Sequence, residues 1–434
     1  MTKKLKFQTP RGMHDILPED QPAYLKIAKT AEEMMGFYGF QRIDTPLVED
    51  AELYEKATGA STDIVEKQMY TFKTKGGDML ALRPEFTPGI ARAYFEHGMV
   101  DRPQPIKLWT SGPLFRHESP QAGRYRQFHQ LDLEVFGEES AAIDAQLIQI
   151  AHALLSDLKF SHLIIEVNSI GDSQCRPYYK KTLVNYLRAR QQSLCADCKR
   201  RLRANPLRVL DCKEEKCQRV RSQAPQMVDH LCEECKNHFK QLLEFLDEAD
   251  LPYHLDPYLV RGLDYYTKTV FEIFSDKTVK APEAEDAPSR TALVGGGRYD
   301  NLLKQLGGKE VPAVGWAAGI ERIVELMKAG GVISEHQVQP KVFLAQLGDL
   351  PKKKSIKLAE EFRKAKIPIA DSLGRDSLRA QLARADKLGV PLTLILGQRE
   401  VLDNTIVIRK MDTGEQETVA LGRAVEEVKQ RLKG

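Results

Sequence analysis

The chain has 434 residues, of which 42% are hydrophobic and 29% charged. This composition excludes a disordered protein. The length is too great for a single hydrophobic core and indicates roughly two to four domains. Its net charge of +3 excludes a globally basic nucleic-acid-binding protein, so any such contact must come from local basic patches. We find no apolar signal segment and no run of about 18 apolar residues, and we expect a cytoplasmic protein without membrane contact.

The first part of the chain predicts a helix followed by short strands. Apolar residues recur at helical spacing and end at a glycine pair, and a Gly-Gly-Asp turn separates two later strands. Glu85 or Thr87 could serve only as a helix cap. The predicted elements are a helix at 21–38, strands at 40–46, 69–72 and 79–83, and a helix that opens at Arg83 and runs through Phe95.

A hairpin is predicted at 106–116 and 126–137. Because alternate side chains of a strand point to opposite faces, its second strand presents a polar face and a core face. Fixed cations beside amide and carboxylate groups suit a ligand with phosphate at one end and hydrogen-bond donors at the other. A solvated sheet face with surface arginines is the alternative. The polar face carries Gln130, Asp132 and Glu134, the core face Leu131, Leu133 and Val135, and the loop and its ends Arg116, Arg124 and Arg126.

The middle of the chain resumes the sheet after an insertion. From about 175 to 250 the sequence is helical, basic and rich in cysteine, and it interrupts a pattern of strands. The segment 276–290 indicates an exposed hairpin loop. Around the insertion we expect helices at 140–159 and 319–328, and strands at 162–168, 270–274, 291–294 and 311–317.

The C-terminal part alternates strands and helices, which predicts a small α/β domain of its own. We find neither a P-loop nor a dinucleotide-binding glycine pattern. A bound nucleotide would therefore lie on an antiparallel sheet with arginines. The expected strands are 341–346, 367–370, 390–396 and 405–409, and the expected helices are 352–365, 377–388 and 424–432.

Four segments place an Arg, Glu or Tyr at a strand end or a helix start: Arg83–Thr87, the hairpin, Leu259–Tyr266 (LVRGLDYY) and Gly315–Arg322. Together they closely resemble the bacterial histidyl-tRNA synthetases, a family of class II aminoacyl-tRNA synthetases. The 21–38 helix with its strand resembles motif 1, the hairpin motif 2 and Gly315–Arg322 motif 3. Leu259–Tyr266 and Gly295–Leu303 resemble segments peculiar to the histidine enzyme. The resemblance covers essentially the whole chain.

The resemblance implies an α+β catalytic domain on an antiparallel sheet (the class II synthetase fold) at 1–330, with the helical insertion inside it. A linker at 331–339 would lead to an anticodon-binding α/β domain at 340–434. The implied activity joins histidine to its tRNA through histidyl-adenylate made from ATP. The implied partners are histidine, ATP, the histidine-accepting tRNA and a second copy in a homodimer, with Mg²⁺ on the leaving pyrophosphate.

The resemblance also implies roles for single residues. Separate residues would contact each part of ATP, each end of histidine and the reacting phosphate. Arg116 would hold the α-phosphate, Glu118 the adenine amino group, Phe128 the adenine face and Arg322 the γ-phosphate; Glu85, Thr87 and Gln130 would bind the amino and carboxylate groups of histidine, Glu134 and Tyr266 its imidazole beside Tyr265, and Arg261 would be a fixed cation at the reacting phosphate.

Two residues depart from the family pattern. Asp132 stands where many relatives have a small residue, and it adds a third carboxylate to the ligand face. Phe86 replaces a common glycine, and it either narrows the site or packs behind it. Taken singly, Tyr265 and Tyr266 could be ordinary strand aromatics, and Arg261 could pair with Asp264 or Glu272.

All seven cysteines lie between Cys175 and Cys235, and an odd number in one region argues against a disulfide scaffold. Two Cys-x-x-Cys pairs indicate a structural zinc with four thiolates as one interpretation. A reduced helical insertion with buried thiols is the other. The zinc candidates are Cys195, Cys198, Cys232 and Cys235.

Two other functions remain open at this point: a non-catalytic paralogue that senses histidine, and an RNA-binding module without chemistry. The arginines at 116, 261 and 322 and the C-terminal domain favour the enzyme. For tRNA contacts we expect the basic run Lys199–Arg203 to face the acceptor stem, unless it is only a solvated helix face. In the C-terminal domain the candidates for phosphate contacts are Arg375, Arg379 and Arg399.

Overall fold

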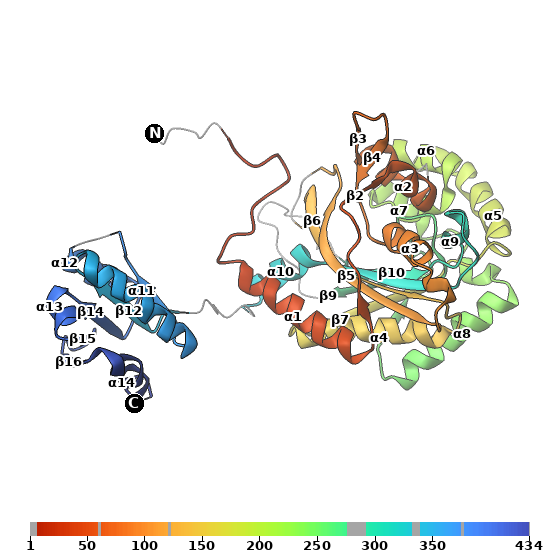
Figure 1. The fold of residues 1–434 in the computed structure, drawn as a ribbon. Coiled ribbons are helices and arrows are strands. Elements are labelled where there is room, and N and C mark those ends of the chain that lie inside the picture. The colour runs from red at the N-terminus through yellow and green to blue at the C-terminus, as the bar shows by residue number, and fades with distance from the viewer. Residues whose placement is uncertain are drawn as a thin grey trace. The chain divides into compact units, whose positions relative to one another are not determined.

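The computed structural model describes residues 7–59, 62–119, 123–275, 292–331, 339–374 and 377–433. The chain divides into two compact units, Met1–Ser334 and Glu335–Gly434 (Figure 1). Among the helices of the described residues, none combines the length and apolarity needed to cross a bilayer. The predicted loop at 276–290, most of the linker at 331–339, and Arg375 lie outside the described residues.

The first unit is built on an eight-stranded sheet with the order β1-β5-β6-β11-β10-β9-β7-β8. The six inner strands pair antiparallel. This antiparallel arrangement confirms the predicted sheet, and the two short edge strands add parallel pairs with their neighbours. The strands of the sheet are β1 (Gln41–Arg42), β5 (Ile106–Phe115), β6 (Gln127–Phe136), β7 (Leu163–Ser169), β8 (Tyr253–Leu255), β9 (Thr267–Ser275), β10 (Ala292–Arg298) and β11 (Ala313–Gly319).

One face of this sheet is covered by helices that bury an apolar core. Leu131, Leu133 and Val135 lie in that core, as the alternation in β6 predicts. Ser140 caps α4, and its hydroxyl oxygen accepts a hydrogen bond from the Ala142 amide. Four helices cover this face (Figure 1): α1 (Gln21–Phe37), α4 (Ala141–Asp157), α8 (Glu233–Glu248) and α10 (Ile320–Ala329).

A second core is formed by three short helices and the insertion, and this unit also contains a small three-stranded sheet. The predicted helical insertion is confirmed, and its helices alternate with single 3-10 turns. The elements are β2 (Val48–Asp50), β3 (Tyr70–Lys73), β4 (Met79–Leu82), α2 (Ala51–Thr58), α3 (Thr87–Glu96) and α9 (Leu302–Gln305), with α5 (Arg176–Ala189), α6 (Ala196–Ala204) and α7 (Glu215–Arg221) in the insertion.

The second unit is a five-stranded mixed sheet with the order β13-β12-β14-β15-β16. Its first three strands are parallel and the last two antiparallel. The predicted alternation is confirmed, but a short helix, α13, and the edge strand β16 escaped prediction. The elements are β12 (Val342–Gln346), α11 (Asp349–Lys364), β13 (Ile369–Asp371), α12 (Leu378–Lys387), β14 (Leu392–Leu396), α13 (Gln398–Leu402), β15 (Thr405–Lys410), β16 (Gln416–Ala420) and α14 (Ala424–Arg431).

Candidate active site

A cavity of about 780 Å³ lies on the polar face of β6. Its walls come from β6, β10 and β11, from the start of α10, from the Leu259–Tyr266 segment and from the insertion. The structure brings all the predicted catalytic and substrate residues to this one cavity. They are Glu85, Thr87, Arg116, Glu118, Phe128, Gln130, Glu134, Arg261, Tyr265, Tyr266 and Arg322.

Cations gather at one end of the cavity. Arg116 donates from Nε to the Pro84 carbonyl at 2.8 Å, and its guanidinium carbon lies 5.2 Å from the ring centre of Phe128. Arg322 donates to the carbonyls of Gly123 and Ala292 at 3.3 and 2.9 Å. Because carbonyls carry no formal charge, these bonds orient the Arg322 guanidinium without neutralising it.

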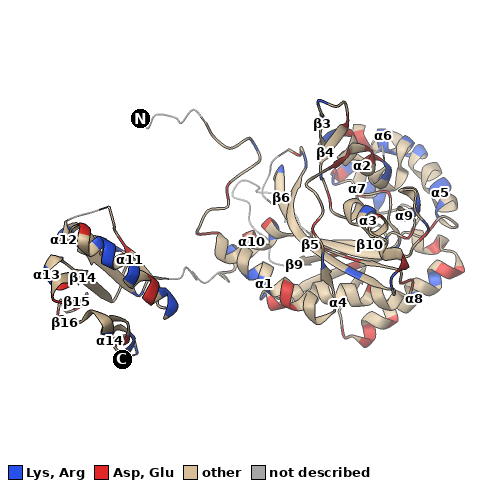
Figure 2. Ribbon diagram, in the orientation of Figure 1, with Lys and Arg blue, Asp and Glu red and all other residues tan. Residues whose placement is uncertain are grey.

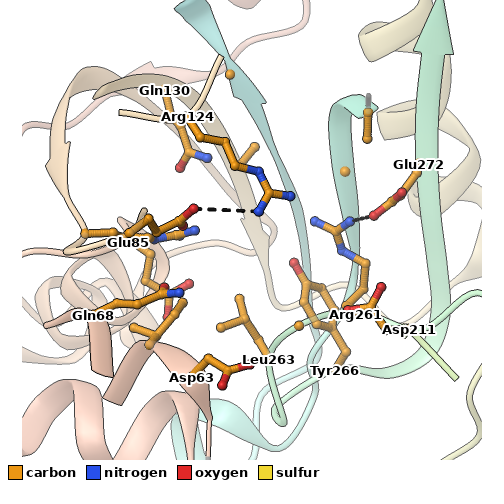
Figure 3. Close-up of a pocket in the computed structure, with 18 of the residues that line it drawn as sticks. Asp63, Gln68, Glu85, Arg124, Gln130, Asp211, Arg261, Leu263, Tyr266 and Glu272 are labelled. Atoms are coloured by element: carbon orange, nitrogen blue, oxygen red, sulfur yellow. Dashed lines mark hydrogen bonds and ion pairs between the residues drawn. The ribbon is translucent and has the colours of Figure 1, made fainter. Parts of the chain in front are cut away.

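The arginines are close enough to influence one another. Burial lowers the pKa of Arg322 below its ordinary value, and the guanidinium groups of Arg124 and Arg116 lower it further. In Figure 3, Arg124 and Arg261 point into the cavity from opposite sides, and Arg261 is bonded to Glu272. Concentrated positive charge of this kind favours a polyanionic ligand.

Carboxylates gather at the other end. Glu85, Asp132 and Glu134 are at most 5% exposed. The Tyr265 hydroxyl donates to Glu85 at 3.0 Å, and the Tyr299 hydroxyl donates to Glu134. Glu85 Oε1 and Asp132 Oδ1 have no hydrogen-bond partner within the described part of the chain. Buried acceptors without partners are costly, so this end of the cavity is suited to a ligand rich in donors.

Burial of these carboxyl groups perturbs their protonation. The pKa of Glu85 is raised to about 7, chiefly by burial and also by the Glu134 carboxylate, against the lowering effects of Arg116 and of the Tyr265 hydroxyl. Burial likewise raises the pKa of Glu134 to about 7 and holds that of Asp132 well above its ordinary value. A positively charged ligand group would offset the cost of ionising this cluster.

Two glycines explain how these side chains fit. Gly315 lies directly opposite Glu134 in the β11–β6 pair, and a Cβ at Gly315 would lie 1.7 Å from Glu134 Oε2. A Cβ at Gly295 would lie 2.5 Å from the Arg261 guanidinium. Any larger residue would displace the charged group, so both glycines create room for the site.

Sequence reasoning missed several residues of the cavity. Tyr299 lies in the Gly295–Leu303 segment but was given no role, and Glu272 was named only as an alternative partner for Arg261. The neighbouring Arg298 is fully buried and pairs with Asp144, so it supports the fold and not the site. Asp63, Gln68 and Asp211 also line the cavity and belong to no motif, whereas Arg124, another lining residue, was named among the hairpin cations.

The two departures from the family pattern have different outcomes. Phe86 is fully buried, and the Arg83 guanidinium carbon lies 4.5 Å from its ring centre. Arg83 donates to Thr45 and Pro113 carbonyls, so Phe86 packs behind the site and does not narrow it. Asp132 lines the cavity as the third carboxylate.

Asp132 leads to a prediction about pH. Its pKa is raised in the folded protein, so its contribution to stability is fully present below the unfolded pKa and is lost as pH rises through the folded pKa. Asp132→Asn should therefore raise the melting temperature of the ligand-free protein by a few degrees at about pH 8, and by little at about pH 5. Thermal unfolding at both pH values measures the difference.

The exposed Asp229 is the matched control for this substitution. Asp229→Asn should give the same small shift at both pH values. An Asp132→Asn gain that is as large at low pH as at high pH would contradict the buried-charge explanation.

The predicted zinc set is wrong in its pairing. Cys195 and Cys198 gather with Cys212 and Cys217, whereas Cys232 and Cys235 gather with Asp172 and Cys175. The two Cys-x-x-Cys pairs lie at the starts of different helices of the insertion, α6 and α8. The first pair lies beside Cys212 and Cys217, and the second beside Asp172 and Cys175. All seven cysteines are free thiols in the structure.

The basic run Lys199–Arg203 is only partly a solvated face. Arg201 turns inward and donates to Asp63 at 2.8 Å, while Lys199, Arg200 and Arg203 are exposed. The Lys and Arg positions of α6 are blue in Figure 2. In the second unit Arg379 is exposed, and Arg399 is exposed with Asp403 3.6 Å away.

Known proteins match this chain over most of its length. The histidyl-tRNA synthetase family model matches residues 12–323, and an anticodon binding domain model matches residues 341–431. The histidine–tRNA ligase of Dehalococcoides mccartyi is 45% identical over 98% of this chain and 100% of that protein. The one from Caldicellulosiruptor saccharolyticus is 40% identical over 99% of this chain and 100% of that protein.

A solved structure has the same fold. The apo histidyl-tRNA synthetase of S. aureus superposes with a TM-score of 0.78 at 34% identity, covering 98% of this chain and 100% of that one. With a family match over most of its length and full-length relatives at 40–45% identity, the chain belongs to the histidyl-tRNA synthetase family of class II aminoacyl-tRNA ligases.

Proposed function

We propose that this cavity activates histidine with ATP, giving histidyl-adenylate and pyrophosphate, and then transfers histidine to the 3′ end of its tRNA. The observation that carries the proposal is that one cavity contains both a group of neighbouring arginines and a group of neighbouring buried carboxylates. ATP and histidine have the complementary charges: phosphates on one, an ammonium group and an imidazole N–H on the other.

The nucleotide would occupy the arginine end. Arg116 is assigned to the α-phosphate, because its bond to the Pro84 carbonyl and its position over Phe128 fix its direction. Phe128 is assigned to the adenine face and Glu118 to the adenine amino group. Arg322 is assigned to the γ-phosphate, because its charge is oriented but not neutralised by the carbonyls of Gly123 and Ala292.

Histidine would occupy the carboxylate end. Glu85, Thr87 and Gln130 are assigned to its amino and carboxylate groups, and the unpartnered Glu85 Oε1 suits an ammonium donor. Glu134 and Tyr266, beside Tyr265, are assigned to the imidazole. A competitor without the ring nitrogens would leave these buried groups unpaired, and such sites reject by about 10⁴-fold or more. No editing domain is then needed.

The reaction would be an in-line attack of the histidine carboxylate on the α-phosphorus, with pyrophosphate leaving. Negative charge grows on the phosphate oxygens, and preorganised cations stabilise it without reorganising at the moment of reaction. Arg261 is assigned this task. Its guanidinium is held in the cavity wall by the ion pair with Glu272, and the absence of a side chain at Gly295 leaves room for it there.

Mg²⁺ is expected on the pyrophosphate. This ion binds phosphate oxygens together with one or two carboxylates, and Glu272 is a carboxylate of the cavity that lies near Arg322. This residue therefore fits the ion. Bound there, Mg²⁺ would neutralise charge on the leaving group, while the arginines of the chain hold the remaining phosphate oxygens.

The tRNA would contact both units. The second unit is assigned to the anticodon, with exposed Arg379 and Arg399 as phosphate contacts. In the insertion, the exposed Lys199, Arg200 and Arg203 of α6 are assigned to the acceptor stem. Because phosphate contacts release counterions, tRNA binding through these residues should become weaker as the salt concentration rises.

A homodimer is the proposed assembly, and exposed apolar side chains of α1 support it. Leu25 is 65% and Phe37 82% exposed, on the helix that resembles motif 1. In analytical ultracentrifugation the wild-type protein should have twice the mass of one chain, and Phe37→Glu should shift the equilibrium toward the monomer. The control is Tyr178→Glu, which changes an exposed side chain on α5 and should leave the protein dimeric. A monomeric wild-type protein would contradict the assembly.

The activity is tested by histidine-dependent exchange of labelled pyrophosphate into ATP. Exchange with histidine, and not with the other amino acids, is the expected result. A protein that binds histidine without exchange would be the non-catalytic sensor instead, and one that binds only RNA would be a module without chemistry.

A further inference from the structure

The insertion contains two compact sets of metal-type ligands to which the proposed reaction gives no role; Cys195 and Cys212 of the first set also line the catalytic cavity. The first is Cys195, Cys198, Cys212 and Cys217, and the second is Asp172, Cys175, Cys232 and Cys235. Within each set the ligand atoms all lie within 4.8 Å of one another. Together they use all seven cysteines of the chain, and a single aspartate completes the second set.

The spacing of the sulfurs is that of a tetrahedral single-metal site. Zinc–thiolate bonds of about 2.3 Å place tetrahedral sulfurs about 3.8 Å apart. Cys195 Sγ and Cys212 Sγ are 3.8 Å apart, and Cys175 Sγ and Cys235 Sγ are 3.9 Å apart. A disulfide requires about 2.0 Å, and an iron–sulfur cluster would push the sulfurs further apart.

Local backbone geometry shapes both sets for thiolates. In the first set, the amide of Cys198 donates to Cys195 Sγ and the amide of Cys195 donates to Cys217 Sγ, both at 3.3 Å. Amide donors to sulfur stabilise the deprotonated form that binds metals. Cys198 and Cys217 are at most 1% exposed, so this thiol cluster is built into the core and not scattered over the surface.

The second set is held in the same way. The amides of Gln174 and Cys175 donate to Asp172 Oδ1 at 2.9 and 3.3 Å, and this oxygen lies 3.5 Å from Cys175 Sγ. Gly171 has a φ of +63°, and a Cβ there would lie 2.5 Å from Cys175 Sγ. The glycine keeps the space beside the ligand atoms open.

We propose that the insertion binds two structural Zn²⁺ ions, one on Cys195, Cys198, Cys212 and Cys217, the other on Asp172, Cys175, Cys232 and Cys235. Each binding step replaces the thiol protons by zinc, with no change of oxidation state. Four thiolates, or three with a carboxylate, are ligand sets that zinc accepts in closed tetrahedral sites.

Both ions would brace the segment that contains Arg261. Beyond Cys198, Arg208 donates to the Gly262 carbonyl and Asn205 to Asp264, each at 2.6 Å. Next to Cys175, Arg176 donates to the Tyr266 carbonyl at 2.6 Å. Each zinc would therefore fix a short stretch of chain that holds one end of the Arg261–Tyr266 segment.

The test is the metal content of the full-length protein purified after growth in zinc-replete medium. Elemental analysis should find two zinc ions per chain. After exchange with Co²⁺ alone, the protein should show the visible bands of tetrahedral thiolate-bound Co²⁺. One zinc or none per chain, or disulfides found by mass after denaturation, would overturn the proposal without any variant.

Single substitutions separate the two sites. Cys198→Ser and Cys235→Ser should each lower the content by one zinc, and the double variant should contain none. Asp172→Asn should weaken only the second site. Its matched control is Asp197→Asn, because Asp197 lies between Cys195 and Cys198 but is exposed and outside both sets; a loss of zinc there equal to that of Cys198→Ser would overturn the assignment. These readouts do not depend on the proposed activity.

Discussion

Replacing Arg261 by histidine is expected to lower the rate of histidine-dependent pyrophosphate exchange by about 10²–10³-fold, the usual cost of removing one preorganised donor. Arg261 is paired with Glu272 and fits against Gly295, so its charge is fixed before substrate arrives. Histidine is shorter and mostly neutral near pH 7. The loss should fall mainly on kcat, because the charge that Arg261 would stabilise develops in the transition state.

The matched control is Arg219→His on α7, where Arg219 and its partner Glu215 are 77% and 78% exposed. An exposed ion pair contributes little, so the rate should stay within about two-fold of wild type. Equal rates for Arg261→His and Arg219→His would show that Arg261 is only a structural partner of Glu272.

Replacing Glu134 by glutamine is expected to raise the KM for histidine by about 10–100-fold, since a charge-assisted hydrogen bond is worth about 1.5–3 kcal/mol. Glutamine has the same shape, so the contact of Gly315 with this side chain is preserved. It cannot, however, present two acceptor oxygens to Tyr299 and an imidazole N–H together. The KM for ATP should change little, because Glu134 lies at the carboxylate end.

Two further variants support the interpretation. Tyr299→Phe removes the hydroxyl that donates to Glu134 and should raise the KM for histidine by less than Glu134→Gln does. Glu139→Gln changes an exposed residue shortly after β6 and should have no effect. If Glu134→Gln raised the KM values for histidine and ATP alike, the assignment of Glu134 to the imidazole would be wrong.

The polar face of β6 was predictable because it depends on local periodicity, whereas the roles of the other site residues were implied by the family resemblance. The alternation in β6 places Gln130, Asp132 and Glu134 on the cavity and Leu131 and Leu133 in the core, and a strand shifted by one residue would reverse both faces. The antiparallel inner sheet was implied by the resemblance to the class II synthetases. The parallel edges were not predicted, because β1 and β8 are only two and three residues long.

The parts that could not be predicted depend on distant packing. The bond between Tyr299 and Glu134 joins residues on β6 and after β10, which are brought together only by β11 between them. The cysteines divide between α6 and α8 by the folding of the whole insertion, which spacing within Cys-x-x-Cys pairs does not reveal. Asp63 and Gln68 reach the cavity from a π-helical turn that has no distinctive pattern.

The central claim is that guanidinium groups from three distant parts of the chain act on one nucleotide, beside carboxylates that bind the amino acid. A crystal structure with ATP and histidinol, which lacks the attacking carboxylate, tests it most directly. We expect the phosphates to contact Arg116, Arg261 and Arg322, and the imidazole to contact Glu134. A nucleotide bound away from these arginines, or an imidazole away from Glu134, would contradict the account.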